Sequence, residues 1–122
     1  MKNKQPSLSV EKLLDFVIEN KESLKESGIL ISKHEINYYG HNYSEYGEYF
    51  ELTLLMRKFH IGYNFITEDS DDWAQAEGYQ THILHEVVEE NKEIEIETNK
   101  LHHLLVNYKS IKRNEQINKL IN

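Results

Sequence analysis

The stretch EYFELTLLMRKF, from Glu48 to Phe59, alternates apolar and polar side chains. Successive side chains of a β-strand point to opposite faces, so this pattern predicts a strand that is buried on one face and exposed on the other. Such strands are typical of antiparallel sheets. The apolar side chains that would share the buried face are Phe50, Leu52, Leu54 and Met56.

Two further strands are predicted next to this stretch. Residues Ile29–Tyr39 (ILISKHEINYY) are rich in β-branched and aromatic residues, and the sequence from Ile61 to Phe65 continues the period of two after a turn expected at Lys58 to His60. Between the first two strands lies NYYGHNYSEYGEY, Asn37–Tyr49, which holds five of the eight tyrosines and is expected to be a connection. Three strands in succession predict a meander.

Helices are predicted on both sides of these strands. Ser9 can cap a first helix whose apolar residues recur at helical spacing until Gly28 ends it. A second helix is expected to begin at Asp69 or Ser70 and to end near Asn91, because acidic residues favour a helix start and an apolar stripe follows.

The C-terminal third is expected to hold one short strand and a last helix. KEIEIETN, from Lys92 to Asn99, alternates strictly, and Thr98 can cap a helix with a leucine-rich stripe. No linker composition or repeat interrupts the chain. We therefore predict one α+β domain over 1–122, with residues 1–8 and 114–122 as candidates for frayed ends. Its antiparallel sheet of three to four strands would carry helices on one face, in the order α-β-β-β-α-β-α.

Composition narrows the class of protein. With 122 residues, 39% of them hydrophobic, the chain can bury one core. The absence of cysteine excludes disulfides and thiolate metal sites and favours a reducing compartment, so we expect a cytoplasmic location. No apolar run is long enough to span a bilayer, so no membrane association is expected.

Charge is distributed unevenly along the chain. Between Ser44 and Glu97 there are fourteen acidic and three basic residues, a net charge of −11, although the whole chain has only −7. Such an acidic block repels nucleic acid, because phosphate affinity comes from Lys and Arg. A basic protein is a more suitable partner, since complementary charge speeds encounter and suppresses wrong partners. The alternative is that these carboxylates only keep the protein in solution.

The sequence contains no motif for catalysis or nucleotide binding. It lacks G-x-G-x-x-G, G-x-x-x-x-G-K-[ST] and G-x-S-x-G, so no cofactor is expected. His82 and His85 would lie three residues apart on the second predicted helix, which makes them the metal candidates, although their order H-x-x-H-E matches no zinc motif. His34, His41 and His60 lie on or near the predicted sheet and could converge for acid–base catalysis.

The tyrosine-rich segment is the strongest functional signal. Tyrosine offers a large contact surface with few torsions to order, so a loop that holds Tyr43 and Tyr46 around Glu45 is suited to anchor a partner. The alternative is that most of these tyrosines only pack on the sheet. The expected partner-binding residues, including carboxylates that would mimic phosphates, are Tyr43, Glu45, Tyr46, Glu68, Asp69, Asp71, Asp72, Glu93, Glu95 and Glu97.

The chain is short and acidic, and it has no cysteine and no recognisable motif. In this general character, though not in individual residues, it is similar to bacterial immunity proteins that neutralise nuclease toxins. The sequence thus favours an inhibitor that binds a basic partner. A phage-encoded inhibitor of a defence nuclease would need the same properties. A small histidine-dependent enzyme would also be compatible with this sequence, as would a homodimer that buries the tyrosine segment.

Overall fold

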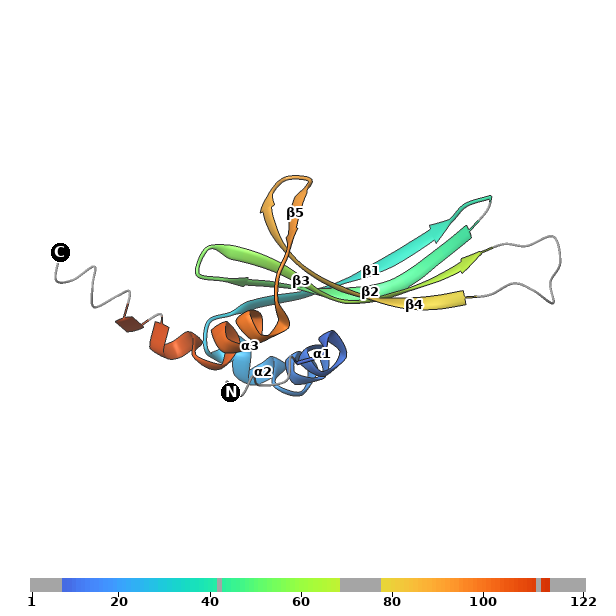
Figure 1. The fold of residues 1–122 in the computed structure, drawn as a ribbon. Helices are drawn as coiled ribbons and strands as arrows, with labels where there is room; N and C mark the ends of the chain where they lie inside the picture. Colours follow the sequence, from blue (N-terminus) through green and yellow to red (C-terminus); the bar gives the residue numbers. More distant parts are fainter. Residues whose placement is uncertain (1–7, 42, 69–77, 112, 115–122) are drawn as a thin grey trace, which may run out of the picture.

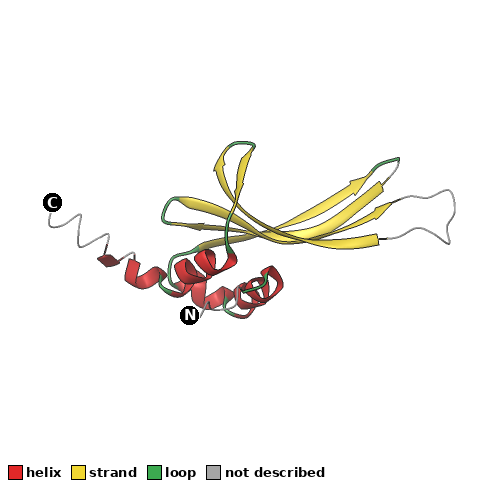
Figure 2. Ribbon diagram, viewed as in Figure 1, coloured by secondary structure: helices red, strands yellow, loops and turns green. Residues whose placement is uncertain are grey.

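The described part of the chain forms a five-stranded antiparallel sheet with helices on one face (Figures 1 and 2). The structure is a computed structural model, and it describes residues 8–41, 43–68, 78–111 and 113–114. The predicted α+β class is confirmed. The predicted strand number and element order are wrong, because the described elements run α-α-β-β-β-β-β-α.

The N-terminal helical region is divided into α1 (Val10–Glu19) and α2 (Lys21–Glu26), where the sequence predicted one helix. Ser9 caps α1 as expected, and its hydroxyl accepts a hydrogen bond from the Lys12 backbone N–H at 3.1 Å. Asn20 is the C-cap of α1: its backbone leaves the helical conformation (φ −108°, ψ 13°), and its backbone N–H and side-chain amide both donate to the Phe16 carbonyl, at 3.0 and 2.9 Å. Helix α3 (Thr98–Val106) has Glu97, and not Thr98, at its N-cap position.

The strands follow one another across the sheet in chain order. They are β1 (Leu30–Tyr39), β2 (Tyr43–Leu54), β3 (Arg57–Glu68), β4 (Gly78–Glu89) and β5 (Lys92–Glu95). Strands β1 and β5 correspond to predicted strands. The meander predicted for the first three strands is confirmed and continues through all five, because each strand pairs antiparallel with the next.

Strand β4 replaces most of the helix predicted from residue 69 or 70 to residue 91. Its residues pair with β3 from Lys58↔Val87 to Thr67↔Gly78, and this long ladder outweighs the local helical spacing of the apolar residues. β-Branched Thr81, Ile83 and Val87 favour the strand as well. Residues 69–77, where the helix was expected to start, lie outside the described residues.

The turn between β2 and β3 lies at Leu55 and Met56, so the prediction of a turn at Lys58 to His60 is wrong. Both turn residues have positive φ, 51° for Leu55 and 62° for Met56, as in the primed two-residue turns that join twisted antiparallel strands. The predicted connection between Asn37 and Tyr49 is also wrong in its extent: β1 and β2 continue through most of it, and the residues between them are 40–42.

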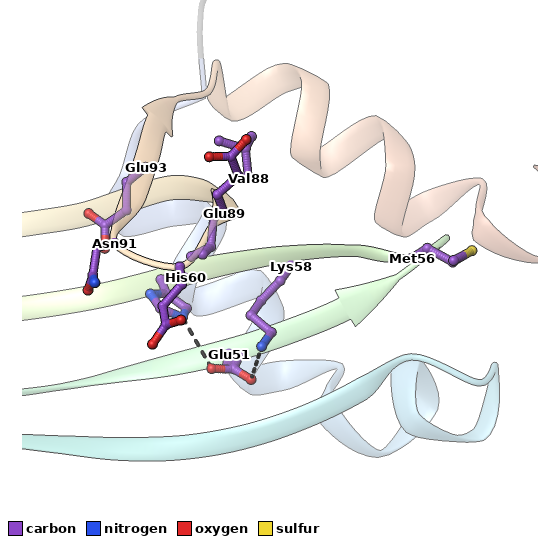
Figure 3. Close-up of a pocket in the computed structure, with 10 residues that line it drawn as sticks. Glu51, Met56, Lys58, His60, Val88, Glu89, Asn91 and Glu93 are labelled. Atoms are coloured by element: carbon purple, nitrogen blue, oxygen red, sulfur yellow. Dashed lines mark hydrogen bonds and ion pairs between the residues drawn. The ribbon is translucent and has the colours of Figure 1, made fainter.

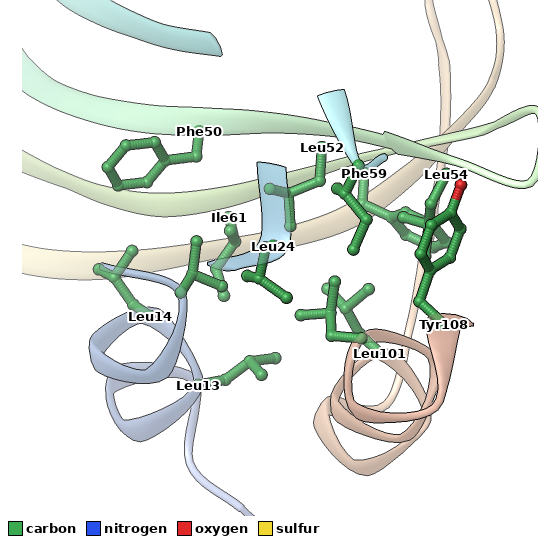
Figure 4. Packing of buried hydrophobic residues seen from close by; sticks show 13 residues of the cluster. Leu13, Leu14, Leu24, Phe50, Leu52, Leu54, Phe59, Ile61, Leu101 and Tyr108 are labelled. Atoms are coloured by element: carbon green, nitrogen blue, oxygen red, sulfur yellow. The ribbon is translucent and has the colours of Figure 1, made fainter. Parts of the chain in front are cut away.

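The core lies between the helices and one end of the sheet (Figure 4). Alternate residues of β2 and β3 meet α1, α2 and α3 there, and Phe59, Leu52, Ile61, Leu13 and Leu101 are fully buried. The other buried members are Leu14, Val17, Leu24, Ile29, Phe50, Leu54, Leu105 and Tyr108. No helix within the described part of the chain is long and apolar enough to cross a membrane.

Two parts of the sheet extend away from this core (Figure 1). The ends of β1–β4 at residues 38–39, 43–46, 66–68 and 78–79 continue beyond the helices. The β4–β5 hairpin rises on the side of the sheet opposite to the helices. We call the surface that the helices cover the helix face and the opposite surface the open face.

Candidate functional site: the open face of the sheet

The open face carries several of the polar and aromatic side chains that the sequence marks as candidates. Strand alternation and register place its residues in rows across the sheet, for example Ser32–Glu51–His60–His85 and Tyr38–Glu45–Ile66–Tyr79. Within the described residues, no helix covers this face (Figure 2). Two clusters on it are candidates for function.

The first cluster, the histidine centre, consists of Glu51, His60, His85 and Glu93 from four adjacent strands. His60 Nδ1 lies 3.0 Å from His85 Nε2, and His85 Nε2 lies 3.2 Å from Glu93 Oε1. The other ring nitrogen of His60, Nε2, lies 3.2 Å from Glu51 Oε2. A single continuous network therefore links β2 to β5.

Burial and neighbouring charge set the protonation of this centre. Burial lowers the pKa of His85, and the attraction of Glu93 only partly opposes that effect. Burial would raise the pKa of Glu51, but its hydrogen bond with His60 and the nearby charge of Lys58 lower it overall. The centre thus combines a carboxylate that holds its charge with an imidazole that favours its neutral form.

Tyr49 fixes the position of two histidine rings. Its ring stacks on His34 with centroids 5.1 Å apart and lies against His60 at 4.7 Å. His34 and His60 are thus on the same face, as the sequence suggested, but Tyr49 lies between them. His41 follows β1, outside this cluster.

A groove of about 580 Å³ borders the histidine centre, between the open face and the β4–β5 hairpin (Figure 3). Figure 3 shows Glu51 held by His60 and by Lys58, whose Nζ lies 3.5 Å from a Glu51 oxygen. The hairpin contributes Glu89, Asn91 and Glu93 to the groove. The groove carries more acidic than basic side chains.

The second cluster, the tyrosine patch, consists of Tyr38, Tyr43 and Tyr79 on the part of the sheet beyond the helices. Tyr38 and Tyr43 pack together with ring centroids 5.0 Å apart. The three side chains remain 47%, 40% and 49% exposed, respectively. Glu45 lies in the same row, and the side-chain amide of Asn64 donates a hydrogen bond of 2.6 Å to it.

The structure brings some of the predicted partner-binding residues together and separates others. Tyr43, Glu45, Glu93 and Glu95 share the open face by strand alternation. Tyr46 is on the helix face, where it packs against Phe65 at 5.4 Å. Glu97 is exposed after β5, Glu68 ends β3 opposite Tyr43, and Asp69, Asp71 and Asp72 lie outside the described residues.

The sequence predicted that His82 and His85 lie on a helix, where they could bind one metal ion together, and this prediction of a helix is wrong. Both residues are on β4, where side chains three positions apart point to opposite faces. His85 instead joins His60 and Glu93, and one ligand atom from each of these three residues lies within 4.8 Å of the others.

Sequence reasoning missed the pairing of Glu51 with His60 because it misplaced one turn. With the turn at Leu55 and Met56, Glu51 is directly opposite His60, and His60 is opposite His85. The period of two in both strands would have revealed this row if the turn had been recognised. Leu-Met is an unusual pair at two positive-φ positions, and no Gly, Asn or Asp marks the site.

Comparison of the chain with family models, with curated proteins and with solved structures finds no match.

Proposed function

We propose that the protein is a binding protein that docks a basic protein partner on the open face of its sheet and thereby inhibits it. The observation that carries this proposal is the tyrosine patch. Three half-exposed tyrosines share a face with carboxylates on a part of the sheet that no described helix covers.

The tyrosine patch has the physical properties of a protein interface. A tyrosine ring buries a large area when a partner covers it and loses the freedom of only two torsions. The ladder of β1–β4 holds these rings on a rigid surface, so little ordering is needed on binding. Isolated exposed aromatic residues are common in proteins, but here three of them lie on one uncovered surface.

The charge of the open face favours a basic partner. Glu45, Glu51, Glu93 and Glu95 lie on it by strand alternation, and Lys58 is already paired with Glu51. A partner with surface Lys and Arg would be steered toward these carboxylates, and salt would weaken the attraction. Proteins that bind nucleic acid carry such basic surfaces, so a nuclease is a suitable partner.

A bacterial nuclease toxin is therefore the partner class that we propose, with this protein as its immunity-type inhibitor. An inhibitor of a defence nuclease encoded by a phage would use the same surface. The carboxylates would occupy positions that substrate phosphates take on the nuclease, and the tyrosines would anchor the complex.

The test is inhibition of basic nuclease domains from bacterial toxin systems by the purified protein, with RNA and DNA cleavage as the readout. A nuclease that is inhibited is then titrated with the protein at low and at high salt. We expect affinity to fall as salt rises. The double variant Tyr43→Ala/Tyr79→Ala is expected to bind at least about tenfold more weakly, which is about 1.4 kcal/mol.

The helix face offers a matched control. Tyr39 and Tyr46 are at least as exposed as the residues of the tyrosine patch and lie on two of the same strands, but they point to the other face. The double variant Tyr39→Ala/Tyr46→Ala should keep its affinity within about threefold. Equal losses in both double variants would overturn the assignment of the open face. Cleavage of RNA or DNA by the protein alone would favour an enzyme, and a doubled mass without partner would favour a homodimer.

A further inference from the structure

The histidine centre has the composition and spacing of a zinc site. Two imidazoles and one carboxylate, those of His60, His85 and Glu93, each offer one ligand atom within 4.8 Å of the others. His60 Nδ1 faces His85 Nε2, which in turn faces Glu93 Oε1. We propose that these three residues bind a zinc ion, with a fourth coordination position left for water or for a side chain of a partner.

The distances between the ligand atoms suit this ion. Zinc ligands at about 2.0–2.1 Å from the metal in a tetrahedral arrangement lie about 3.3 Å from one another. The separations are 3.0 Å between His60 Nδ1 and His85 Nε2 and 3.2 Å between His85 Nε2 and Glu93 Oε1. The two imidazole nitrogens therefore need only a small displacement to accept a shared metal in place of their hydrogen bond.

Glu51 gives His60 the support that metal-binding histidines usually have. A histidine that ligates through one ring nitrogen commonly donates its other N–H to a carboxylate, which fixes the ring and makes the ligating nitrogen more basic. His60 Nε2 is 3.2 Å from Glu51 Oε2, on the side of the ring away from His85. Lys58 and the ring of Tyr49 hold this pair in place in turn.

The ligand set selects the class of metal. Two imidazoles and one carboxylate suit zinc and related transition metals, whereas magnesium and calcium prefer sites made of oxygen ligands. The His60 and His85 side chains are only 16% and 20% exposed, and Glu93 is 52% exposed. The two largely buried imidazole rings on β3 and β4 would thus bind the ion on the side of the sheet, and the more exposed Glu93 of the β4–β5 hairpin would bind it on the side of the solvent.

The position of Glu93 predicts what the ion does for the structure. Glu93 lies on β5, a four-residue strand at the edge of the sheet, while His60 lies on the central strand β3. A bound ion would tie the hairpin to the sheet. His60 and Glu93 also line the groove, so the fourth position would be reached from there (Figure 3).

The experiment is calorimetric titration of zinc chloride into the protein, freed of metal by dialysis against chelator and carrying no histidine tag. We expect one zinc ion per chain, with a dissociation constant in the micromolar range or below, and a rise in thermal midpoint of several degrees. Magnesium and calcium should produce neither effect. Ring-nitrogen chemical shifts should change at His60 Nδ1 and His85 Nε2.

Variants decide whether the ion is at this centre. His85→Ala should abolish binding, and Glu93→Gln should weaken it at least about tenfold; because Glu93 is half-exposed, this variant is expected to fold even if a histidine variant does not. Glu51→Gln should weaken binding about tenfold without a change in stoichiometry. His82→Ala, also on β4 but on the other face, is the matched control and should bind as the unchanged protein does.

Two results would overturn the proposal. One is the absence of zinc binding by the unchanged protein. The other is binding that survives in both His85→Ala and Glu93→Gln, which would place the ion elsewhere on the chain. Because these measurements need no protein partner, their outcome is independent of the proposed inhibition.

Discussion

Arg57 on β3 and Glu86 on β4 are joined by two parallel hydrogen bonds, from Arg57 Nε at 2.8 Å and from its Nη2 at 2.9 Å. Glu86 is the buried charged residue of the described core, and Arg57 also lies over the ring of Phe59 at 5.1 Å. The pair thus lies next to Phe59 of the core, which is also the strand partner of Glu86. It neutralises a carboxylate that would be costly to bury alone.

Removal of this arginine should destabilise the protein. In Arg57→Ala, the Glu86 carboxylate stays buried without its charged donor, and we expect the free energy of unfolding to fall by about 1.5–3 kcal/mol. Lys33→Ala is the control, because Lys33 forms an exposed ion pair with Glu48 at 2.8 Å. Its loss should cost much less stability than the loss of Arg57, because solvent screens an exposed ion pair. Urea unfolding of the two variants and of the unchanged protein measures both losses of stability. Equal losses in the two variants would contradict the view that the burial of Glu86 makes its ion pair the more important one.

The same pair predicts how stability depends on pH. The hydrogen bonds from Arg57 lower the pKa of Glu86 below its usual value, although burial opposes the effect. A lowered pKa in the folded state contributes stability that is present above the pKa of an unfolded glutamate and is lost as pH falls through the folded value. Thermal midpoints measured from neutral pH down to about pH 3 should therefore fall less steeply in Glu86→Gln than in the unchanged protein. If the thermal midpoints of the two proteins fall equally with pH, the ionisation of Glu86 does not contribute to stability in this way.

Gly62 lies where β2 and β3 approach too closely for a side chain to fit. A Cβ at this position would collide with the Glu48 carbonyl oxygen and the Tyr49 backbone, so Gly62→Ala should force the two strands apart. We expect a loss of about 1–3 kcal/mol in urea unfolding. Gly40→Ala is the control, because there a Cβ would meet only the exposed ring of Tyr38, which can move. The prediction is wrong if both variants unfold alike.

Met56 offers a stabilising substitution. Its side chain is fully exposed, and its φ of 62° is unfavourable for a residue with a Cβ. In Met56→Gly this strain disappears, and we expect the free energy of unfolding to rise by about 1 kcal/mol. Leu55→Gly is the comparison: Leu55 also has a positive φ but packs against the core, so its loss of packing should cancel or exceed the gain. A drop in stability for Met56→Gly would contradict the account of the turn.

Local patterns along the chain determined several parts of this protein. The alternation around Phe50 and Leu52 predicted a strand buried on one face, and Ser9 predicted the start of α1. The strands β1 and β5 and a leucine-rich last helix also followed from short-range periodicity, although the predicted cap of that helix, Thr98, was wrong. These features depend on side chains within a few residues of one another, so the sequence alone is sufficient for them.

Tertiary pairing decided the rest. Residues 78–89 have apolar residues at helical spacing, but only the completed sheet provides the ladder with β3 that makes them a strand. That ladder brings His85 to His60, and the β4–β5 hairpin adds Glu93, although His60 is far from both in the chain. The tertiary structure also makes residues 43–46 part of β2, which separates Tyr43 from Tyr46, because side chains three positions apart on a strand point to opposite faces. The register of β4 against β3 joins residues that are distant in sequence, so local patterns did not specify that His85 and Glu93 would meet His60 on the open face.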